Sequence, residues 1–301
     1  MAVFYNQATL SYNGNVTGSN ITTGEIVATL SADKNAVSDT YTGMGDITYA
    51  VSLVNSGSTD FTGLTVTDDL GRYTLTNGVT EVVPLNYIAG TVNYYVNGVK
   101  QADPEVSAEE PLTIEGIRVP AGGNALILYT ARPNQFAPVG ADAAITNRAS
   151  VSGGGLVNPV TAEETITHST EPNLTISKSL DPLVVSENGT VTYTFSIQNY
   201  GSTAAEAGDN AVFRDTFDPI LNISSVTFNG TPWVNGTDYN YSTANGEFTS
   251  QDGRITVPAA TYSQDETTGV WAIQPGTSTL VITGSISSAA NTSPADTPAA
   301  N

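Results

Sequence analysis

The sequence predicts an all-β protein with two tandem immunoglobulin-like antiparallel β-sandwich domains and a separate N-terminal strand. Three observations lead to this prediction. The composition favours strands, apolar and polar residues alternate along many short segments, and one series of segments occurs twice at a constant spacing. Because the second copy lacks one segment of the first, we expect the two domains to differ in completeness.

The composition indicates strands and turns. The 301 residues are enough for two sandwich domains of about 100 to 150 residues each. Thr, Ser, Val, Asn and Gly predominate, and Tyr outnumbers Phe by 14 to 8, which is typical of β-structure. The chain has no cysteine, so neither disulfides nor thiolate metal sites can stabilise it. A covalent crosslink would need other chemistry.

The repeat is clearest in two segments with the pattern of a half-buried strand. Residues 45–59, GDITYAVSLVNSGST, match residues 189–203, GTVTYTFSIQNYGST. Apolar side chains occupy every second position, namely Ile47, Tyr49, Val51 and Leu53 in the first copy and Val191, Tyr193, Phe195 and Ile197 in the second. Asn-Gly and Pro-Gly turn signals separate such segments, which favours an antiparallel sandwich.

These patterns divide the chain into four parts. Residues 1–24 are expected to form a strand and a linker, 25–155 the first sandwich, 156–286 the second sandwich, and 287–301 a disordered tail. The first sandwich ends in an alternating segment, residues 143–153, for which the second sandwich has no counterpart. Domain 2 is therefore expected to lack its last strand.

The counterpart lies at the other end of the chain. Residues 2–14, AVFYNQATLSYNG, align without a gap on residues 143–155, AAITNRASVSGGG. Asn6 then matches Asn147, and Ala8 matches Ala149. An incomplete sandwich exposes apolar core and unpaired backbone groups, whereas a free strand has an apolar face with nothing to cover it.

These two defects complement each other across neighbouring copies of the chain. If residues 2–12 of one subunit add a strand to domain 2 of the next, the contact propagates head to tail into a fibre. The donor strand would contribute Val3 or Phe4 and the alternate positions Asn6, Ala8 and Leu10. The alternative is that the strand folds back into its own domain 2, which the intervening domain 1 makes geometrically awkward.

Three residue types recur at matching positions of the two copies. The pairs are Lys34 with Lys178 in the first strand, Asp68 with Asp215 on a central strand, and Asn147 with Asn6 in the last strand. Burial lowers the pKa of a lysine and makes it nucleophilic, and a buried aspartic acid can polarise an amide carbonyl and transfer protons. Such a set can form a Lys–Asn isopeptide bond with loss of ammonia. The alternative is a buried ion pair beside an asparagine bonded to the backbone.

The segments ISKSLDPLVVSENGTVTYTFSIQNYG, VFRDTF and AITNRASV carry a resemblance to a known family. Over residues 30–152 and 174–286 the chain resembles the conserved repeat of bacterial surface and spore proteins called domain of unknown function eleven. That repeat is similar to isopeptide-forming domains of Gram-positive pilins and adhesins, and similar repeats occur in spore-appendage subunits. The resemblance implies an immunoglobulin-like fold and autocatalytic crosslinking.

Carried over residue by residue, the resemblance implies that Lys34 bonds to Asn147 within domain 1, assisted by Asp68. In domain 2, Lys178 would be assisted by Asp215 and would bond to Asn6 of a neighbouring subunit. The second bond would therefore be intermolecular and would lock the fibre end to end.

Two departures from the family pattern leave points open. The acid of domain 1 is one of two adjacent residues, Asp68 and Asp69. The segment around Lys34, SADKNAV, is also more polar than the matching SKSLDPL around Lys178, which weakens the expectation that Lys34 is buried.

The charge balance and the motifs exclude several classes of function. With 29 acidic and 9 basic residues the net charge is −20, which repels nucleic acid and anionic membranes. No segment is apolar over enough residues for membrane insertion, and no signal peptide is visible in MAVFYNQATLSYNG. No phosphate loop, nucleophile elbow or metal motif occurs, so we expect no enzyme activity, no metal and no cofactor.

The sequence therefore predicts a structural subunit of an extracellular fibre, either a pilus-like filament or a spore appendage, on the cell or spore surface. Its partner would be itself in a head-to-tail homopolymer, with room for accessory anchor or tip proteins. The alternative is an adhesin or stalk fragment that binds a host or cell-wall ligand, with truncation as the reason for the missing strand.

Overall fold

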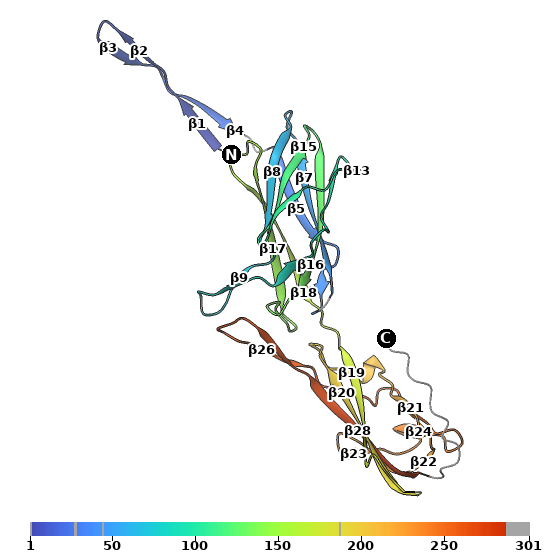
Figure 1. Ribbon diagram of the computed structural model, residues 1–301. Coiled ribbons are helices and arrows are strands. Elements are labelled where there is room, and N and C mark those ends of the chain that lie inside the picture. The colour runs from blue at the N-terminus through green and yellow to red at the C-terminus, as the bar shows by residue number, and fades with distance from the viewer. Residues whose placement is uncertain (1, 27–28, 44, 187, 287–301) are drawn as a thin grey trace. The chain divides into compact units, whose positions relative to one another are not determined.

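The computed structural model describes residues 2–26, 29–43, 45–186 and 188–286. Two compact units divide the chain: unit 1 comprises Met1–Pro138, Ala143–His168 and Glu266–Val270, and unit 2 comprises Val139–Asp142, Ser169–Asp265 and Trp271–Asn301. Unit 1 holds domain 1 and an N-terminal arm, and unit 2 holds domain 2. The regular structure is strands in mostly antiparallel sheets (Figure 1), with one 3-10 turn, η1 (Ala207–Asp209), among the described residues. The predicted all-β class is confirmed.

Domain 1 is a sandwich of two sheets. The first has the order β13 (Val99–Lys100), β12 (Asn93–Val96), β16 (Asn124–Pro133), β7 (Ile47–Asn55) and β5 (Leu30–Ala36), with β11 (Leu85–Tyr87) also paired to β16. The second has the order β14 (Glu105–Glu109), β15 (Leu112–Val119), β8 (Phe61–Asp68), β17 (Ala144–Gly153), β18 (Val160–His168) and β6 (Thr40–Tyr41). A small ribbon pairs β9 (Tyr73–Thr74) with β10 (Glu81–Val82).

Alternation along the strands builds one core between these sheets. Ile47, Tyr49, Val51 and Leu53 of β7 are at most 2% exposed and share a cluster with Leu64 and Val66 of β8. Burying a side chain of this size stabilises the fold by about 1.5 to 3 kcal/mol. The inward positions predicted for this strand are confirmed.

Domain 2 repeats the first sheet of domain 1 but not all of the second. Its first sheet has the matching order β23 (Thr231–Pro232), β22 (Leu221–Phe228), β28 (Gly276–Ile286), β20 (Thr190–Asn199) and β19 (Leu174–Asp181). Its second sheet contains β24 (Tyr239–Tyr241), β25 (Glu247–Ser250) and β21 (Arg214–Thr216), and a separate hairpin pairs β26 (Thr261–Gln264) with β27 (Trp271–Gln274). β21 occupies the position of β8 and is an edge strand: among the described residues of domain 2, no strand pairs with its free side, where β17 pairs with β8 in domain 1. The counterparts of β17 and β18 are therefore missing.

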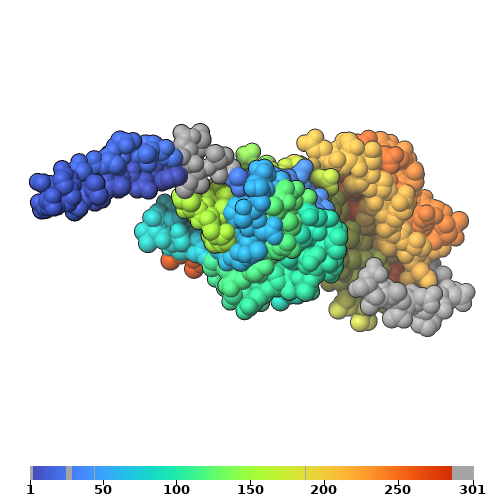
Figure 2. All heavy atoms as spheres, turned by 90° about the horizontal axis from the view of Figure 1, so that it is seen from above, coloured from blue at the N-terminus to red at the C-terminus, as the bar shows by residue number. Residues whose placement is uncertain are grey.

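Residues 2–26, which we call the arm, form a narrow antiparallel ribbon, drawn in dark blue in Figures 1 and 2. In it β1 (Ala2–Asn6) pairs with β4 (Thr22–Ile26), and β2 (Thr9–Tyr12) pairs with β3 (Asn15–Gly18). Asn13 and Gly14 turn the chain with φ of 45° and 80°. Asn-Gly is the favoured pair for a two-residue hairpin turn that needs positive φ at both positions.

The structure differs from the sequence prediction at two boundaries. Residues 13–24, expected to be a linker, contain β3 and most of β4, because the Asn-Gly turn folds the chain back on itself. Domain 1 extends beyond residue 155 to His168, because β18 pairs with β17 over eight residues. The predicted tail, residues 287–301, lies outside the described residues.

Candidate functional site

Three strands bring the sequence-predicted Lys34, Asp68 and Asn147 into one place in domain 1. β5 is an edge strand of the first sheet, and β8 and β17 are neighbours in the second, where Asp68 pairs with Ala149. All three side chains point inward, and Lys34, Asp68 and Asn147 are 1%, 1% and 0% exposed. Buried charged groups are stable only where they are paired and hydrogen-bonded.

Hydrogen bonds connect the three side chains through a tyrosine. Lys34 Nζ donates to Asp68 Oδ2 over 2.5 Å, and the Tyr129 hydroxyl donates to the same oxygen over 2.7 Å. Asn147 Nδ2 donates to the Tyr129 hydroxyl oxygen over 3.0 Å. The Asn147 Oδ1 atom is buried and has no hydrogen-bond partner among the described residues. The amide carbonyl of Asn147 is therefore free to accept a proton or a hydrogen bond within the cluster.

Burial determines the acid–base properties of this cluster. Desolvation lowers the pKa of Lys34, and the negative charge of Asp68 opposes that effect. Burial raises the pKa of Tyr129 well above its ordinary value, so its hydroxyl keeps its proton. A lysine that loses its proton more readily, a carboxylate in contact with it and a nearby primary amide are the groups that isopeptide formation requires.

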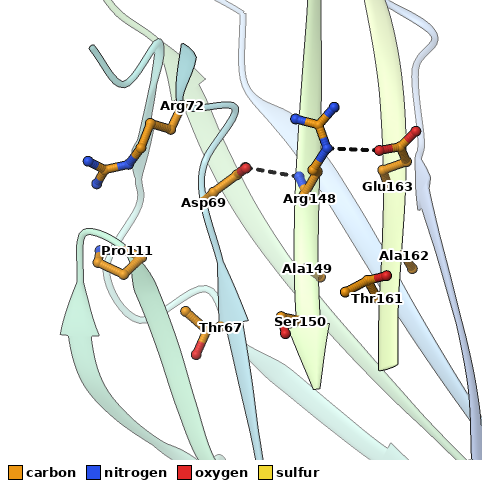
Figure 3. Close-up of a pocket in the computed structure, with 10 residues that line it drawn as sticks. All are labelled: Thr67, Asp69, Arg72, Pro111, Arg148, Ala149, Ser150, Thr161, Ala162 and Glu163. Atoms are coloured by element: carbon orange, nitrogen blue, oxygen red, sulfur yellow. Dashed lines mark hydrogen bonds and ion pairs between the residues drawn. The ribbon is translucent and has the colours of Figure 1, made fainter. Parts of the chain in front are cut away.

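Asp69, the other candidate acid of domain 1, lies on the opposite face of the sheet. Its carboxylate accepts two backbone N–H groups, one of them that of Arg148 over 2.9 Å. The Arg148 side chain pairs with Glu163 over 2.9 Å, and all three residues line an outer groove of about 790 Å³ (Figure 3). Arg148 follows Asn147 in β17, so its side chain points outward whereas that of Asn147 points inward. Asp69 lies on the outer side with Arg148, and Asp68 is therefore the acid that contacts Lys34.

Domain 2 contains the same lysine–aspartate pair in an open setting. Lys178 Nζ lies 2.6 Å from Asp215 Oδ2 and 4.7 Å from the ring centre of Tyr193, which matches Tyr49 of domain 1. The Lys178 and Asp215 side chains are 42% and 18% exposed, compared with 0% and 1% for Lys34 and Asp68. The sequence patterns around the lysines favoured burial of Lys178 over Lys34, and that expectation was wrong. In domain 1 the strands β17 and β18 cover Lys34, and domain 2 has no described counterpart of them over Lys178. The polarity of the residues around each lysine gives no information about this cover.

The open side of domain 2 is an apolar groove of about 290 Å³, which we call the acceptor groove. It is lined by Leu174, Thr175 and Ile176 of β19, by Ile197 and Ile255, and by the segment Ala211, Val212, Phe213 and Arg214 that leads into β21. Leu174 and Ile176 are 38% and 57% exposed. Exposed apolar side chains beside an unpaired strand edge are typical of a docking site for a further strand.

The predicted donor residues lie in the arm and are exposed. Asn6 ends β1, where it pairs with Thr22 of β4, and Phe4 and Leu10 are 53% and 63% exposed. Alternation places Phe4 on the Asn6 face of the ribbon and Val3, which is 46% exposed, on the other. Ala8 is also exposed, and its backbone N–H donates to the Ser19 hydroxyl. Phe4 and Asn6 therefore share one face of β1, and the other predicted donor residues, Ala8 and Leu10, follow after β1 ends, with Leu10 in β2.

The sequence prediction omitted two tyrosines that complete the domain 1 cluster. Tyr49 and Tyr129 face each other on paired strands, and Lys34 Nζ lies 4.9 Å from the ring centre of Tyr49. A tyrosine at an inward position usually needs a partner for its hydroxyl, which is the signal that could have identified Tyr129, whereas the buried Tyr49 hydroxyl has no hydrogen-bond partner among the described residues. In domain 2, Ile282 occupies the position of Tyr129 opposite Tyr193, so that hydroxyl is not repeated.

Neither a metal-binding cluster nor a membrane-spanning helix occurs in the part of the chain that the structure describes. No group of three or more His, Cys, Asp or Glu side chains there could hold a metal ion. No helix within those residues is long and apolar enough to cross a membrane.

No protein-family model matches the sequence, and no curated protein sequence is significantly similar to it. Among solved structures, the pilus backbone protein RrgB of Streptococcus pneumoniae is 13% identical with a TM-score of 0.34, over 82% of this chain and 55% of that one. BcpA, the major pilin subunit of Bacillus cereus, is 10% identical with a TM-score of 0.33, over 90% of this chain and 73% of that one.

A third solved structure has a different role. AvmM, which catalyses a macrocyclization in alchivemycin A biosynthesis, is 13% identical with a TM-score of 0.29, over 55% of this chain and 97% of that one. In the comparison with RrgB, this chain spans about half the length of the RrgB structure. At these TM-scores the likeness bears on neither activity nor partners.

Proposed function

We propose that this chain is the structural subunit of an extracellular fibre on a cell or spore surface. The arm of one subunit completes domain 2 of the next by strand addition, and repetition of this contact produces a head-to-tail homopolymer. The contact is heterologous, because the arm and domain 2 are different surfaces. It therefore propagates instead of closing into a dimer.

One observation carries this proposal: domain 2 ends its second sheet at β21, where domain 1 continues into β17. The buried Asn147 of β17 matches the exposed Asn6 of the arm, and the lysine–aspartate pairs match as well. Docking would cover the acceptor groove and the Asn6 face of the arm together. Burial of Phe4 and Leu10 at about 1.5 to 3 kcal/mol each would offset part of the cost of association, and backbone pairing adds to this.

The same contact supports a covalent step. In domain 1, Lys34 would transfer a proton to Asp68, and the neutral amine would attack Cγ of Asn147. A new Nζ–Cγ bond forms, and the proton passes from the aspartic acid to Nδ2, so that the Cγ–Nδ2 bond breaks and ammonia departs. The attacking Nζ gives up its second proton to the carboxylate of Asp68, which leaves a neutral amide and a protonated aspartic acid. At the joint, Lys178, Asp215 and the neighbour's Asn6 would react in the same way and lock the fibre.

Electron microscopy of the purified chain tests the polymer. We expect filaments that grow with protein concentration and whose subunits are joined end to end. Monodisperse subunits at all concentrations would contradict the proposal and favour the adhesin or stalk function instead.

Intact mass tests the covalent step in domain 1 independently of polymerisation. We expect the subunit to be lighter than its sequence by one ammonia, because Lys34 and Asn147 lose one when they join. The Asn147→Ala variant is the control, since it keeps the Lys34–Asp68 pair but removes the amide, and it should have its full sequence mass. A wild-type subunit with the full sequence mass after prolonged incubation would show that Lys34 and Asn147 remain unjoined.

A further inference from the structure

The arm differs from a single donor strand because it is folded as a ribbon of two strands. We propose that it docks as a two-stranded unit: β1 and β2 take the place of β17, and β4 takes the place of β18 and covers β19. This inference rests on the proposed function and specifies the surface of the arm that domain 2 recognises. It also assigns a role to β4, whose first three residues, 22–24, the sequence placed in a linker.

Domain 1 shows why one strand is not enough to close the sandwich. β17 fills the position beside β8, but the lysine lies on β5, in the other sheet, and β18 provides the cover there. Ile166 of β18 is fully buried in the core. Glu164 of β18 is close enough to Lys34 for its charge to act on the pKa of that lysine. Both strands of the hairpin therefore seal the cluster.

The exposure of β19 shows that domain 2 lacks this second cover. Leu30 of β5 is 4% exposed, whereas Leu174, its counterpart in β19, is 38% exposed. Ile176 is 57% exposed although it occupies an inward position like that of the partly buried Ala32. A strand added to β21 alone would extend the second sheet by one strand spacing of about 4.8 Å and would leave the face of β19 without the counterpart of β18.

The register of the arm matches the register of the β17–β18 hairpin at the reacting residue. Asn147 pairs with Glu164 in domain 1, and Asn6 pairs with Thr22 in the arm. Directly opposite residues in an antiparallel pair share a face of the sheet, so Thr22 lies on the Asn6 face, as Glu164 lies on the Asn147 face. A second strand that carries Thr22 would thus arrive where β18 carries Glu164.

The side chains of the arm also keep the Asn6 face thin at one position of the second strand. The ring of Phe4 lies over Gly24, its partner across the ribbon, in the space that any side chain at Gly24 would fill. Around Gly24 the bulk of this face is therefore carried by Phe4 of the first strand. The second strand thus leaves room at Gly24 for an exposed apolar side chain of β19.

Docking of both strands would also control the covalent step. Water reaches the amino group of Lys178 in the free subunit, because its side chain is 42% exposed. Removal of that water favours the neutral amine, as it does for the buried Lys34. The second strand would complete this desolvation, so that Lys178 becomes reactive only when a neighbour's arm, with its Asn6, is in place.

Two adjacent threonines give a matched test, because both are exposed in the free arm and they lie on opposite faces of β4. The chain has no cysteine, so Thr22→Cys and Thr23→Cys each introduce a single thiol of nearly the same size as the residue replaced. In unassembled subunits both thiols should react with a maleimide at similar rates. In filaments we expect the Thr22→Cys thiol to react at least ~10-fold more slowly and the Thr23→Cys thiol to be unchanged.

Equal reactivity of the two thiols in filaments would overturn the two-stranded docking while leaving strand donation intact. Arginine variants extend the test to assembly: Thr22→Arg should prevent filament formation because it buries an unpaired charge, and Thr23→Arg should assemble normally. Normal assembly of Thr22→Arg would likewise reject the inference. If the unmodified chain forms no filaments, the proposed function itself fails, together with this inference.

Discussion

Deletion of residues 2–12 should abolish filament formation at every concentration at which the full chain polymerises. The deletion removes β1 and β2, and with them Asn6 and the apolar side chains that would cover the acceptor groove. It leaves every described strand pairing of the two sandwiches in place, because β1 and β2 pair only with β4 and β3. Electron microscopy and light scattering of the deletion variant measure the loss, and persistent filaments would contradict strand donation.

A matched pair of double variants shows which face of the arm is responsible. Phe4→Ser with Leu10→Ser removes two exposed apolar side chains of the predicted donor set, and Val3→Ser with Tyr5→Ser removes two from the face of β1 opposite Asn6. The first pair should raise the concentration needed for assembly by at least ~100-fold, from about 1.5 to 3 kcal/mol per side chain. The second pair should change it little. Equal effects would mean that the arm docks through another surface.

The deletion variant should also act as a chain terminator when it is mixed with the full chain. It cannot donate an arm, but its acceptor groove is intact and can receive one. Each such subunit would end a growing filament, so a minor fraction should shorten filaments markedly. Unchanged filament lengths would show that domain 2 does not accept the arm.

Removal of the acid should have very different effects in the two domains. Asp68→Ala leaves the fully buried Lys34 without its partner, and we expect a loss of about 3 to 5 kcal/mol in the free energy of unfolding of domain 1. Asp215→Ala leaves Lys178 in contact with water, because its side chain is 42% exposed, and should cost domain 2 less than about 1 kcal/mol in the free subunit.

The two tryptophans make this comparison measurable within one chain. Trp233 and Trp271 both belong to unit 2, so tryptophan fluorescence follows the unfolding of domain 2, whereas far-ultraviolet circular dichroism follows both domains. In urea, Asp68→Ala should shift the dichroism transition and leave the fluorescence transition in place. Equal shifts for the two aspartate variants would contradict the difference in burial.

The sequence determined much of the fold because its signals are local and periodic. Alternation in residues 47–53 is enough to identify the inward face of β7, since a pleated strand repeats every two residues. The internal repeat identified matching lysines and aspartates, because two copies of one fold place matching positions in matching environments. The contact of Lys34 with Asp68, and the place of Asn147 beside them, followed that expectation.

Only the tertiary structure decided how well each site is covered and which further residues join it. Tyr129 meets Asp68 across a distance of 61 residues in sequence, and no local pattern reports such a contact. The turn at Asn13 and Gly14 was present in the sequence, but the pairing of Asn6 with Thr22 depends on the register that this turn sets. Burial of a charged side chain depends on which strands lie over it, and these come from distant segments. For this reason two lysines at matching positions differ so much in exposure.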